Sequence, residues 1–270
     1  MIYIYDGTYE GFLSAVFDAY TLKKEPADIV PETGDIQIGL GGDYHRVETA
    51  EEKAGRLRAG MDKIGDGFSF QTYSAFASWM PGKEMAIYRY IVLGFRIKEK
   101  IFSKLDDDDV RKVLDMCGQT SREIYKWRGF LRFSGLDNNV YYAEMSPQNN
   151  VLKSIMPHFT RRMYHKPFLI HDTTYRQAGL WDTEKWFIRS SEGLVLPELH
   201  GDEAKYRYMW KLFYDTTAIE GRENTKRRQQ VMPIRYQKQV TELRGQPLPK
   251  PAPAGLQGAE RKVLAEGAGE

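Results

Sequence analysis

Apolar residues recur at helical spacing through the first half of the chain, and this period predicts a series of amphipathic helices. The predicted helices span about residues 8–20, 48–64, 68–79, 83–105 and 110–128. A short strand, MIYIYD, precedes the first helix, and Thr8 is its predicted N-cap. The four aspartates at 106–109 precede the last of these helices, where the helix dipole favours negative charge. We interpret them as a cap, because consecutive helical carboxylates point around the axis and do not converge on a metal.

The hydrophobic period changes at Gly129. The stretches FLRFSG and VYYAEM flank LDNN, and this pattern predicts a β-hairpin, since asparagine tolerates positive φ. The stretch SPQNNVLKSIMPHFTRRM predicts a helix with Ser146 as N-cap, Pro147 in the first position and a break or kink at Pro157. Two further strands, KPFLIHD and KWFIRS, follow around a link that contains Gly179.

The last third begins with an amphipathic helix over residues 202–219, followed by a basic segment and a short final helix. After Gly245 the composition turns to Pro, Gly, Ala and charge, which cannot bury a core. The sequence therefore predicts one α+β domain over residues 1–244, mostly helical with a small antiparallel β-sheet. Residues 245–270 are predicted to form a disordered low-complexity tail.

Composition narrows the class of protein. Hydrophobic residues make up 41% of the chain, enough for a sizeable core. The single cysteine, Cys117, is predicted to be a small core residue, and its isolation excludes an internal disulfide and cysteine-based zinc or iron–sulfur sites. No signal peptide or membrane-length apolar run is present, so we expect a cytoplasmic protein without a bound cofactor.

The net charge is only +2, so any affinity for anions must come from local clusters. Residues 120–190 hold eleven Lys and Arg against six Asp and Glu, and residues 222–244 hold seven against two. Aromatic residues interleave with both clusters, a composition that suits phosphate contact and base stacking. The expected nucleic-acid contacts are Arg128, Arg132, Arg161, Arg162, Lys166, Arg222, Asn224, Arg227, Arg228, Arg235 and Tyr236.

Three of the five histidines lie in the stretch MPHFTRRMYHKPFLIHD, as His158, His165 and His171. Their spacings of seven and six differ from the i,i+4 pair of helical metal sites, and Pro167 places His165 outside the helix. Four interpretations stay open: a metal site, a proton shuttle, ordinary structural hydrogen bonds, and phosphate contact by the neighbouring arginines and Lys166. The candidate catalytic residues are His158, His171 and Asp172, and Glu144 is a further candidate acid.

Several motifs occur together in a fixed order: YDGTYEGFLSAVFDAY, GFLRF, YYAEMSPQNNVLKSIMPHFTRR, LIHD and GRENTKRRQQVMPIRYQKQVTEL. In this order, over residues 2–244, the chain resembles a bacterial family of DNA-metabolism or DNA-repair proteins that contains a domain of unknown function. The resemblance implies a role beside a DNA-modification radical SAM protein. The resemblance also extends to chains in which the same domain is fused to a uracil-DNA-glycosylase-type domain, and we expect this chain to act without such a domain.

We therefore expect a DNA-binding accessory protein of DNA repair or DNA metabolism that acts with a radical SAM partner. One alternative is a nucleic-acid-directed hydrolase that uses His158, His171 and Asp172. The other is a protein-docking module that does not contact DNA.

Overall fold

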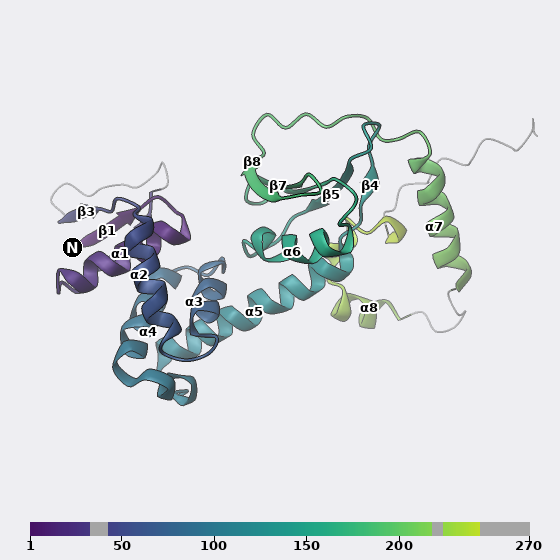
Figure 1. Ribbon diagram of the computed structural model, residues 1–270. Coiled ribbons are helices and arrows are strands. Elements are labelled where there is room, and N and C mark those ends of the chain that lie inside the picture. The colour runs from purple at the N-terminus through teal and green to yellow at the C-terminus, as the bar shows by residue number, and fades with distance from the viewer. Residues whose placement is uncertain (33–42, 218–223, 244–270) are drawn as a thin grey trace, which may run out of the picture. The chain divides into compact units, whose positions relative to one another are not determined.

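The computed structural model describes residues 1–32, 43–217 and 224–243. These residues divide into two compact units: residues 1–125 with 147–151, and residues 126–146 with those from 152 onward. Helix α5 (Asp108–Phe130) begins in the first unit and ends in the second (Figure 1). The predicted tail, 245–270, and Arg222 lie outside the described residues. Whether residues 1–244 act as one domain stays a prediction.

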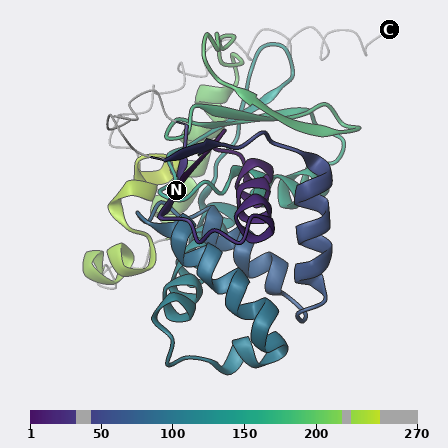
Figure 2. The same ribbon diagram turned by 90° about the vertical axis from the view of Figure 1, so that its left-hand side faces the viewer.

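The first unit contains a three-stranded parallel sheet. Strand β1 (Ile2–Tyr5) lies at its centre, between β2 (Asp28–Pro31) and β3 (Tyr44–Arg46). Helix α1 (Tyr9–Thr21) follows β1 and lies beside this sheet (Figure 2). Thr8 caps α1 as predicted, because its hydroxyl accepts a hydrogen bond from the backbone N–H of Gly11.

Helices build the rest of the first unit. They are α2 (Glu51–Asp62), α3 (Phe68–Phe76), α4 (Lys83–Ile97), the 3-10 helix η1 (Lys98–Ser103) and the first part of α5. The aspartate run caps α5 as predicted: the Asp107 carboxylate accepts hydrogen bonds from the backbone N–H groups of Asp109 and Val110, at 3.0 and 3.1 Å. Cys117 is buried in the core of this unit, and burial raises the pKa of its thiol to about 12, so it is not a reactive thiolate.

The second unit contains a five-stranded sheet. Its strands, in spatial order, are β4 (Ser134–Gly135), β5 (Tyr141–Met145), β6 (Phe168–Asp172), β7 (Gln177–Trp181) and β8 (Trp186–Ser190). The α+β class and the β4–β5 hairpin are confirmed, but a purely antiparallel sheet is wrong, because β5 and β6 run parallel. Helix α6 (Leu152–Arg162) connects them, and such a crossover returns the chain in the same direction. The predicted link around Gly179 is itself strand β7.

Helix α6 packs on β7, and Gly179 makes this approach possible. A Cβ atom on Gly179 would lie 2.6 Å from the sulfur of Met156 and 3.2 Å from a methyl of Leu152. The helix continues through Pro157, but its predicted start at Ser146 is wrong. The Glu123 carboxylate accepts hydrogen bonds from the backbone N–H groups of Gln148 and Asn149, which holds this segment outside the helix.

Four helical segments follow β8 among the described residues. They are α7 (Glu203–Thr217), α8 (Thr225–Val231), α9 (Ile234–Gln237) and the 3-10 helix η2 (Thr241–Leu243). Helix α7 forms where predicted, yet none of its residues is buried. Across the described ranges, no helix is long and apolar enough to cross a membrane.

Candidate nucleic-acid interface

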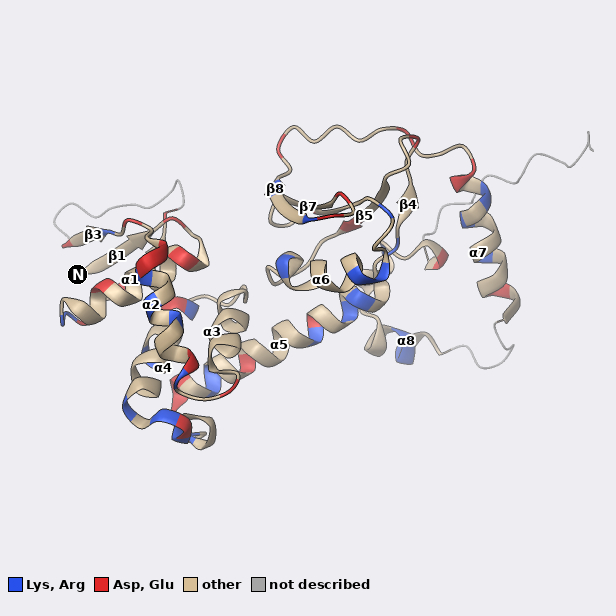
Figure 3. Ribbon diagram, in the orientation of Figure 1, with Lys and Arg blue, Asp and Glu red and all other residues tan. Residues whose placement is uncertain are grey.

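Exposed cations gather on α6, on the loop after it and on α8 (Figure 3). Arg161 and Arg162 end α6, and Arg227 and Arg228 lie within α8. All four side chains are exposed, and none forms an ion pair within the described part of the chain. Lys166 is exposed as well, with its ammonium 5.7 Å from the centre of the Tyr141 ring. These five side chains are available to an anionic partner.

Other predicted contacts have structural roles. Arg132 forms an ion pair with Glu242, with Nη2 2.9 Å from the carboxylate, and Arg128 donates to the backbone carbonyl of Ser154 at 3.3 Å. Asn224 caps α8, since its side-chain oxygen accepts a hydrogen bond from the backbone N–H of Arg227 at 2.8 Å. These residues build the scaffold around the exposed cations.

Tyr236 is fully buried in an aromatic cluster of the second unit. Its ring lies 4.8 Å from Trp127 and 5.6 Å from Phe130. The Arg235 guanidinium lies 4.8 Å above the same ring and donates to the Tyr236 hydroxyl at 2.9 Å. Burial leaves no face of Tyr236 open to a nucleobase, so its ring anchors the C-terminal segment.

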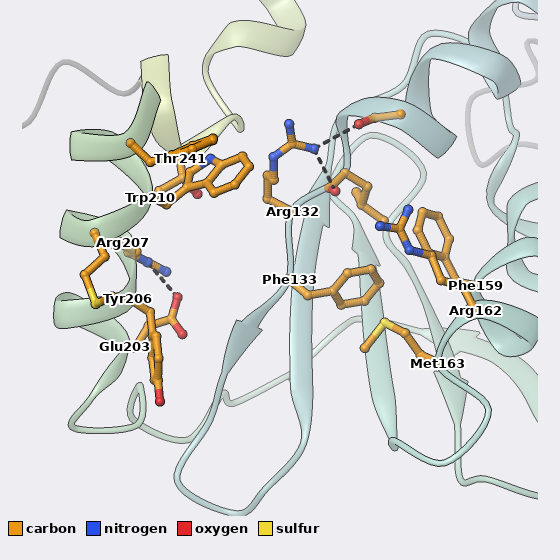
Figure 4. Close-up of a pocket in the computed structure, with 14 residues that line it drawn as sticks. Arg132, Phe133, Phe159, Arg162, Met163, Glu203, Tyr206, Arg207, Trp210 and Thr241 are labelled. Carbon is orange, nitrogen blue, oxygen red and sulfur yellow. Dashed lines mark hydrogen bonds and ion pairs between the residues drawn. The ribbon is translucent and has the colours of Figure 1, made fainter. Parts of the chain in front are cut away.

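A pocket of about 860 Å³ lies within the second unit, between α7, α6 and the segment that leads into β4 (Figure 4). Aromatic and methionine side chains supply much of its lining, and three arginines reach it. The aromatic and methionine residues are Phe133, Phe159, Met163, Tyr206, Met209, Trp210 and Phe213. The arginines are Arg132, Arg162 and Arg207.

Polar contacts hold α7 in place as one wall of this pocket. The Glu203 carboxylate accepts hydrogen bonds from the backbone N–H of Gly135 at 3.0 Å and from Arg207 at 2.8 Å. Arg207 also donates to the hydroxyl of Ser134 at 2.6 Å. Further along α7, the indole N–H of Trp210 donates to Glu242 at 2.9 Å. Side-chain hydrogen bonds of Glu203, Arg207 and Trp210 thus hold α7 in place. The rings of Tyr206, Trp210 and Phe213, which we call the aromatic wall, stay largely exposed.

Glu242 joins two walls of the pocket. One carboxylate oxygen accepts from Arg132 and the other from Trp210. Burial alone would raise the pKa of Glu242, but these hydrogen bonds and the positive charge of Arg132 outweigh burial and lower it. The carboxylate is therefore ionised at neutral pH and keeps both partners in position.

The candidate catalytic residues fall into different surroundings. The His171 ring nitrogen Nδ1 lies 3.1 Å from the hydroxyl of Tyr142, which also lies 3.4 Å from the Glu144 carboxylate. The buried Asp172 accepts from the backbone N–H groups of Thr174 and Tyr175, so it caps the turn after β6. Sequence thus identified Glu144 and His171 as candidates, and the parallel register of β5 and β6 pairs them directly.

His158 lies on α6 among arginines. Burial and the charges of Arg128, Arg162 and Arg161 lower its pKa, so its ring is neutral at physiological pH. Its buried Nε2 atom has no hydrogen-bond partner among the residues that the structure describes. Within the described ranges no three His, Cys, Asp or Glu side chains are placed to hold a metal ion.

The sequence did not single out the aromatic wall of α7. Tyr206, Trp210 and Phe213 recur at the spacing of any buried helix face, and only the structure shows that these rings stay largely exposed among the described residues. The one available signal was composition, because seven of the fifteen residues of α7 are large and apolar or aromatic in a segment beside basic clusters.

Comparison with known proteins assigns a family. Residues 81–242 match the model of a family described as a domain of unknown function, DUF4130. No curated protein matches the chain. The matched residues include α4, α5, the five-stranded sheet and every residue that lines the pocket. Because this match covers more than half of the 270 residues, the chain belongs to the DUF4130 family.

Proposed function

We propose that this protein binds nucleic acid through its second unit and serves as an accessory protein in DNA metabolism. One observation carries the proposal. The exposed pair Arg161 and Arg162 has no carboxylate partner among the described residues and lies beside a pocket lined with aromatic rings, whereas Arg132 and Arg207 are paired.

Physical chemistry supports this use of the surface. An exposed guanidinium binds phosphate without breaking an existing ion pair, and its binding releases counterions from the nucleic acid. Exposed aromatic rings offer faces on which unpaired bases stack. With a net charge of only +2, any attraction to nucleic acid must be local, and the exposed Arg161 and Arg162, unpaired among the described residues, supply such a local charge beside the pocket.

The family resemblance of the motifs suggests the partner. We propose that the protein acts beside a radical SAM enzyme and presents nucleic acid to it. An iron–sulfur cluster of that enzyme class needs several cysteine ligands, and this chain has one cysteine, which is buried. The chemistry would therefore reside in the partner, and the present chain would supply binding.

A second candidate function rests on the contact between His171, Tyr142 and Glu144. A histidine oriented by a tyrosine hydroxyl near a carboxylate can move a proton, so a hydrolase is the alternative. Cleavage of an oligonucleotide that is abolished in His171→Gln, with binding retained, supports this alternative. An oligonucleotide that stays uncleaved in the presence of the wild-type protein argues against this alternative.

A titration of labelled single- and double-stranded oligonucleotides at about 50 mM and about 200 mM salt tests the main proposal. We expect binding that weakens steeply with salt. Arg161→Ala/Arg162→Ala and Arg227→Ala/Arg228→Ala should each weaken it. On a single strand, the salt slope should fall by about 0.7 for each phosphate that the variant no longer neutralises.

The matched control is Lys185→Ala/Arg189→Ala, which removes two exposed cations from the second unit outside the pocket lining. This control should bind like the wild type. Absence of binding at low salt would contradict the proposal and favour a protein-docking module, which co-purification with the radical SAM partner would then test.

A further inference from the structure

The pocket beside α7 has a volume and a lining that suit an aromatic ligand. Its volume of about 860 Å³ falls within the range of about 300–1,000 Å³ typical of small-ligand pockets. Tyr206 and Phe213 are 62% and 57% exposed, far above the exposure of rings that serve a core. Across the pocket from α7, the lining includes Phe133, whose ring packs edge to face on the buried Phe159 (Figure 4).

Trp210 is held in one orientation within this wall. Its indole N–H donates to Glu242 at 2.9 Å, and its ring stacks on Phe213 with centroids 5.8 Å apart and planes 29° from parallel. A ring fixed before the ligand arrives loses little conformational entropy on binding. The side chain is still 44% exposed, so a face remains for a ligand.

The charges around the pocket select the kind of ligand. Arg132 is paired with Glu242, and Arg207 is paired with Glu203. Arg162 is the only lining arginine without a carboxylate partner within the described part of the chain. The charges of Glu242 and Glu203 are thus balanced by Arg132 and Arg207. The positive charge of Arg162 remains. A ligand that joins an aromatic ring to an anion complements this arrangement.

We propose that the pocket takes one unstacked base of single-stranded nucleic acid, which stacks on the aromatic wall of α7 while its phosphate contacts Arg162. This inference rests on the proposed function and refines it. A base within a duplex is already stacked and paired, so the pocket selects single strands or bases turned out of a helix. Stacking also makes the site tolerant of sequence, because every base has a π-face.

A purely apolar peptide fits the site less well, because it offers no anionic group to Arg162. A second copy of this chain meets the same objection unless it brings an acidic group. The binding experiment distinguishes both occupants from a base.

The test compares a thymidine strand of about ten nucleotides with an abasic strand of equal length and charge, using the full chain. We expect the wild type to bind the thymidine strand more tightly. Tyr206→Ala/Phe213→Ala should lower that affinity on the order of tenfold and leave the abasic strand nearly unaffected. The thymidine strand should also quench tryptophan fluorescence, and Trp210→Phe should remove the quench.

Leu212→Ala is the matched control, because Leu212 is 49% exposed on the same helix but does not line the pocket. It should bind both strands like the wild type, and circular dichroism checks that each variant is folded. Equal affinity for the two strands, with the steep salt dependence intact, overturns the base pocket and leaves the proposed function standing. Binding of neither strand at low salt overturns both. Loss of self-association in Tyr206→Ala/Phe213→Ala with strand affinity unchanged identifies a second copy as the occupant and also overturns the base pocket.

Discussion

Helices α4 and α7 are each fifteen residues long, and both carry large apolar residues at helical spacing. Helix α4 buries seven of its residues, whereas α7 buries none. In α4 the Tyr90 ring stacks on Phe68 with centroids 4.8 Å apart, so its apolar face is covered within its own unit. In α7 the anchoring contacts are polar and the rings remain open.

The same amphipathic pattern therefore has two different roles in this chain. An apolar face that is covered stabilises the fold, while one that is held by hydrogen bonds and left open is available to a ligand. Exposed aromatic clusters rimmed by polar residues mark interaction sites in monomers. The comparison predicts that substitutions on the two helices have opposite consequences for stability and binding.

The largest expected effect is on the buried face of α4. Ile91→Ala should lower the free energy of unfolding by about 2–5 kcal/mol, because it removes fully buried methyl groups and leaves a cavity. Phe213→Ala on α7 should change it by about 0.5 kcal/mol or less, despite removing a larger side chain. Urea unfolding measures both. Similar losses of stability would show that the α7 face is covered after all.

A smaller effect is expected at the anchor of α7. Glu242→Ala leaves the Arg132 guanidinium and the Trp210 indole without their acceptor. The free energy of unfolding should therefore fall by about 1–3 kcal/mol. Amide exchange should speed up in α7 and stay unchanged in α4. Glu242→Gln is the matched control, since an amide oxygen still accepts one of these bonds. Unchanged exchange in α7 would mean that other contacts hold the helix.

Close packing of α4 predicts a further effect at Gly94. A Cβ atom there would lie 2.6 Å from the Phe68 ring. Overpacking in Gly94→Ala should therefore lower the free energy of unfolding by about 1–3 kcal/mol. The higher helix propensity of alanine should offset about 1 kcal/mol of this loss. Gly55→Ala in α2 is the control, because nothing lies within 4 Å of its added methyl. Thermal unfolding should show Gly55→Ala neutral or stabilised. A stabilised Gly94→Ala would contradict the tight packing of this face.

The smallest effect is a pH dependence confined to the second unit. The pKa of Glu242 is lower in the folded than in the unfolded protein, so its stabilising contribution is complete above its unfolded pKa. That contribution disappears as the pH falls through the folded pKa. Stability measured from neutral to acid pH should therefore fall less steeply in Glu242→Gln than in the wild type. Identical pH profiles of stability in the two proteins would show that Glu242 does not contribute to the pH dependence.

Much of the fold follows from local pattern. The strand at Ile2, the Thr8 cap and the aspartate cap of α5 depend on neighbouring residues, and each formed as predicted. The start of α6 did not, because Glu123, more than twenty residues away, takes the backbone N–H groups of the expected first turn. The parallel β5–β6 pairing also depends on a crossover that strand composition does not reveal.

The candidate site was less predictable for the same reason. Sequence identified Arg161 and Arg162 by charge, but it gave equal weight to Arg132, which an ion pair with distant Glu242 occupies. It chose Tyr236 for stacking, although that ring is buried, and passed over Phe213, which is exposed. Which ring is covered depends on contacts between segments far apart along the chain.

Hydrogen–deuterium exchange of the full chain, with and without the thymidine strand at low salt, shows which helix contacts the strand. Ligand contact on the aromatic wall should slow exchange in α7 and at the C-terminal end of α6, and leave α4 unchanged. Protection in α4, or no change in α7 while the strand is bound, would contradict the claim that the open face of α7 is the binding surface.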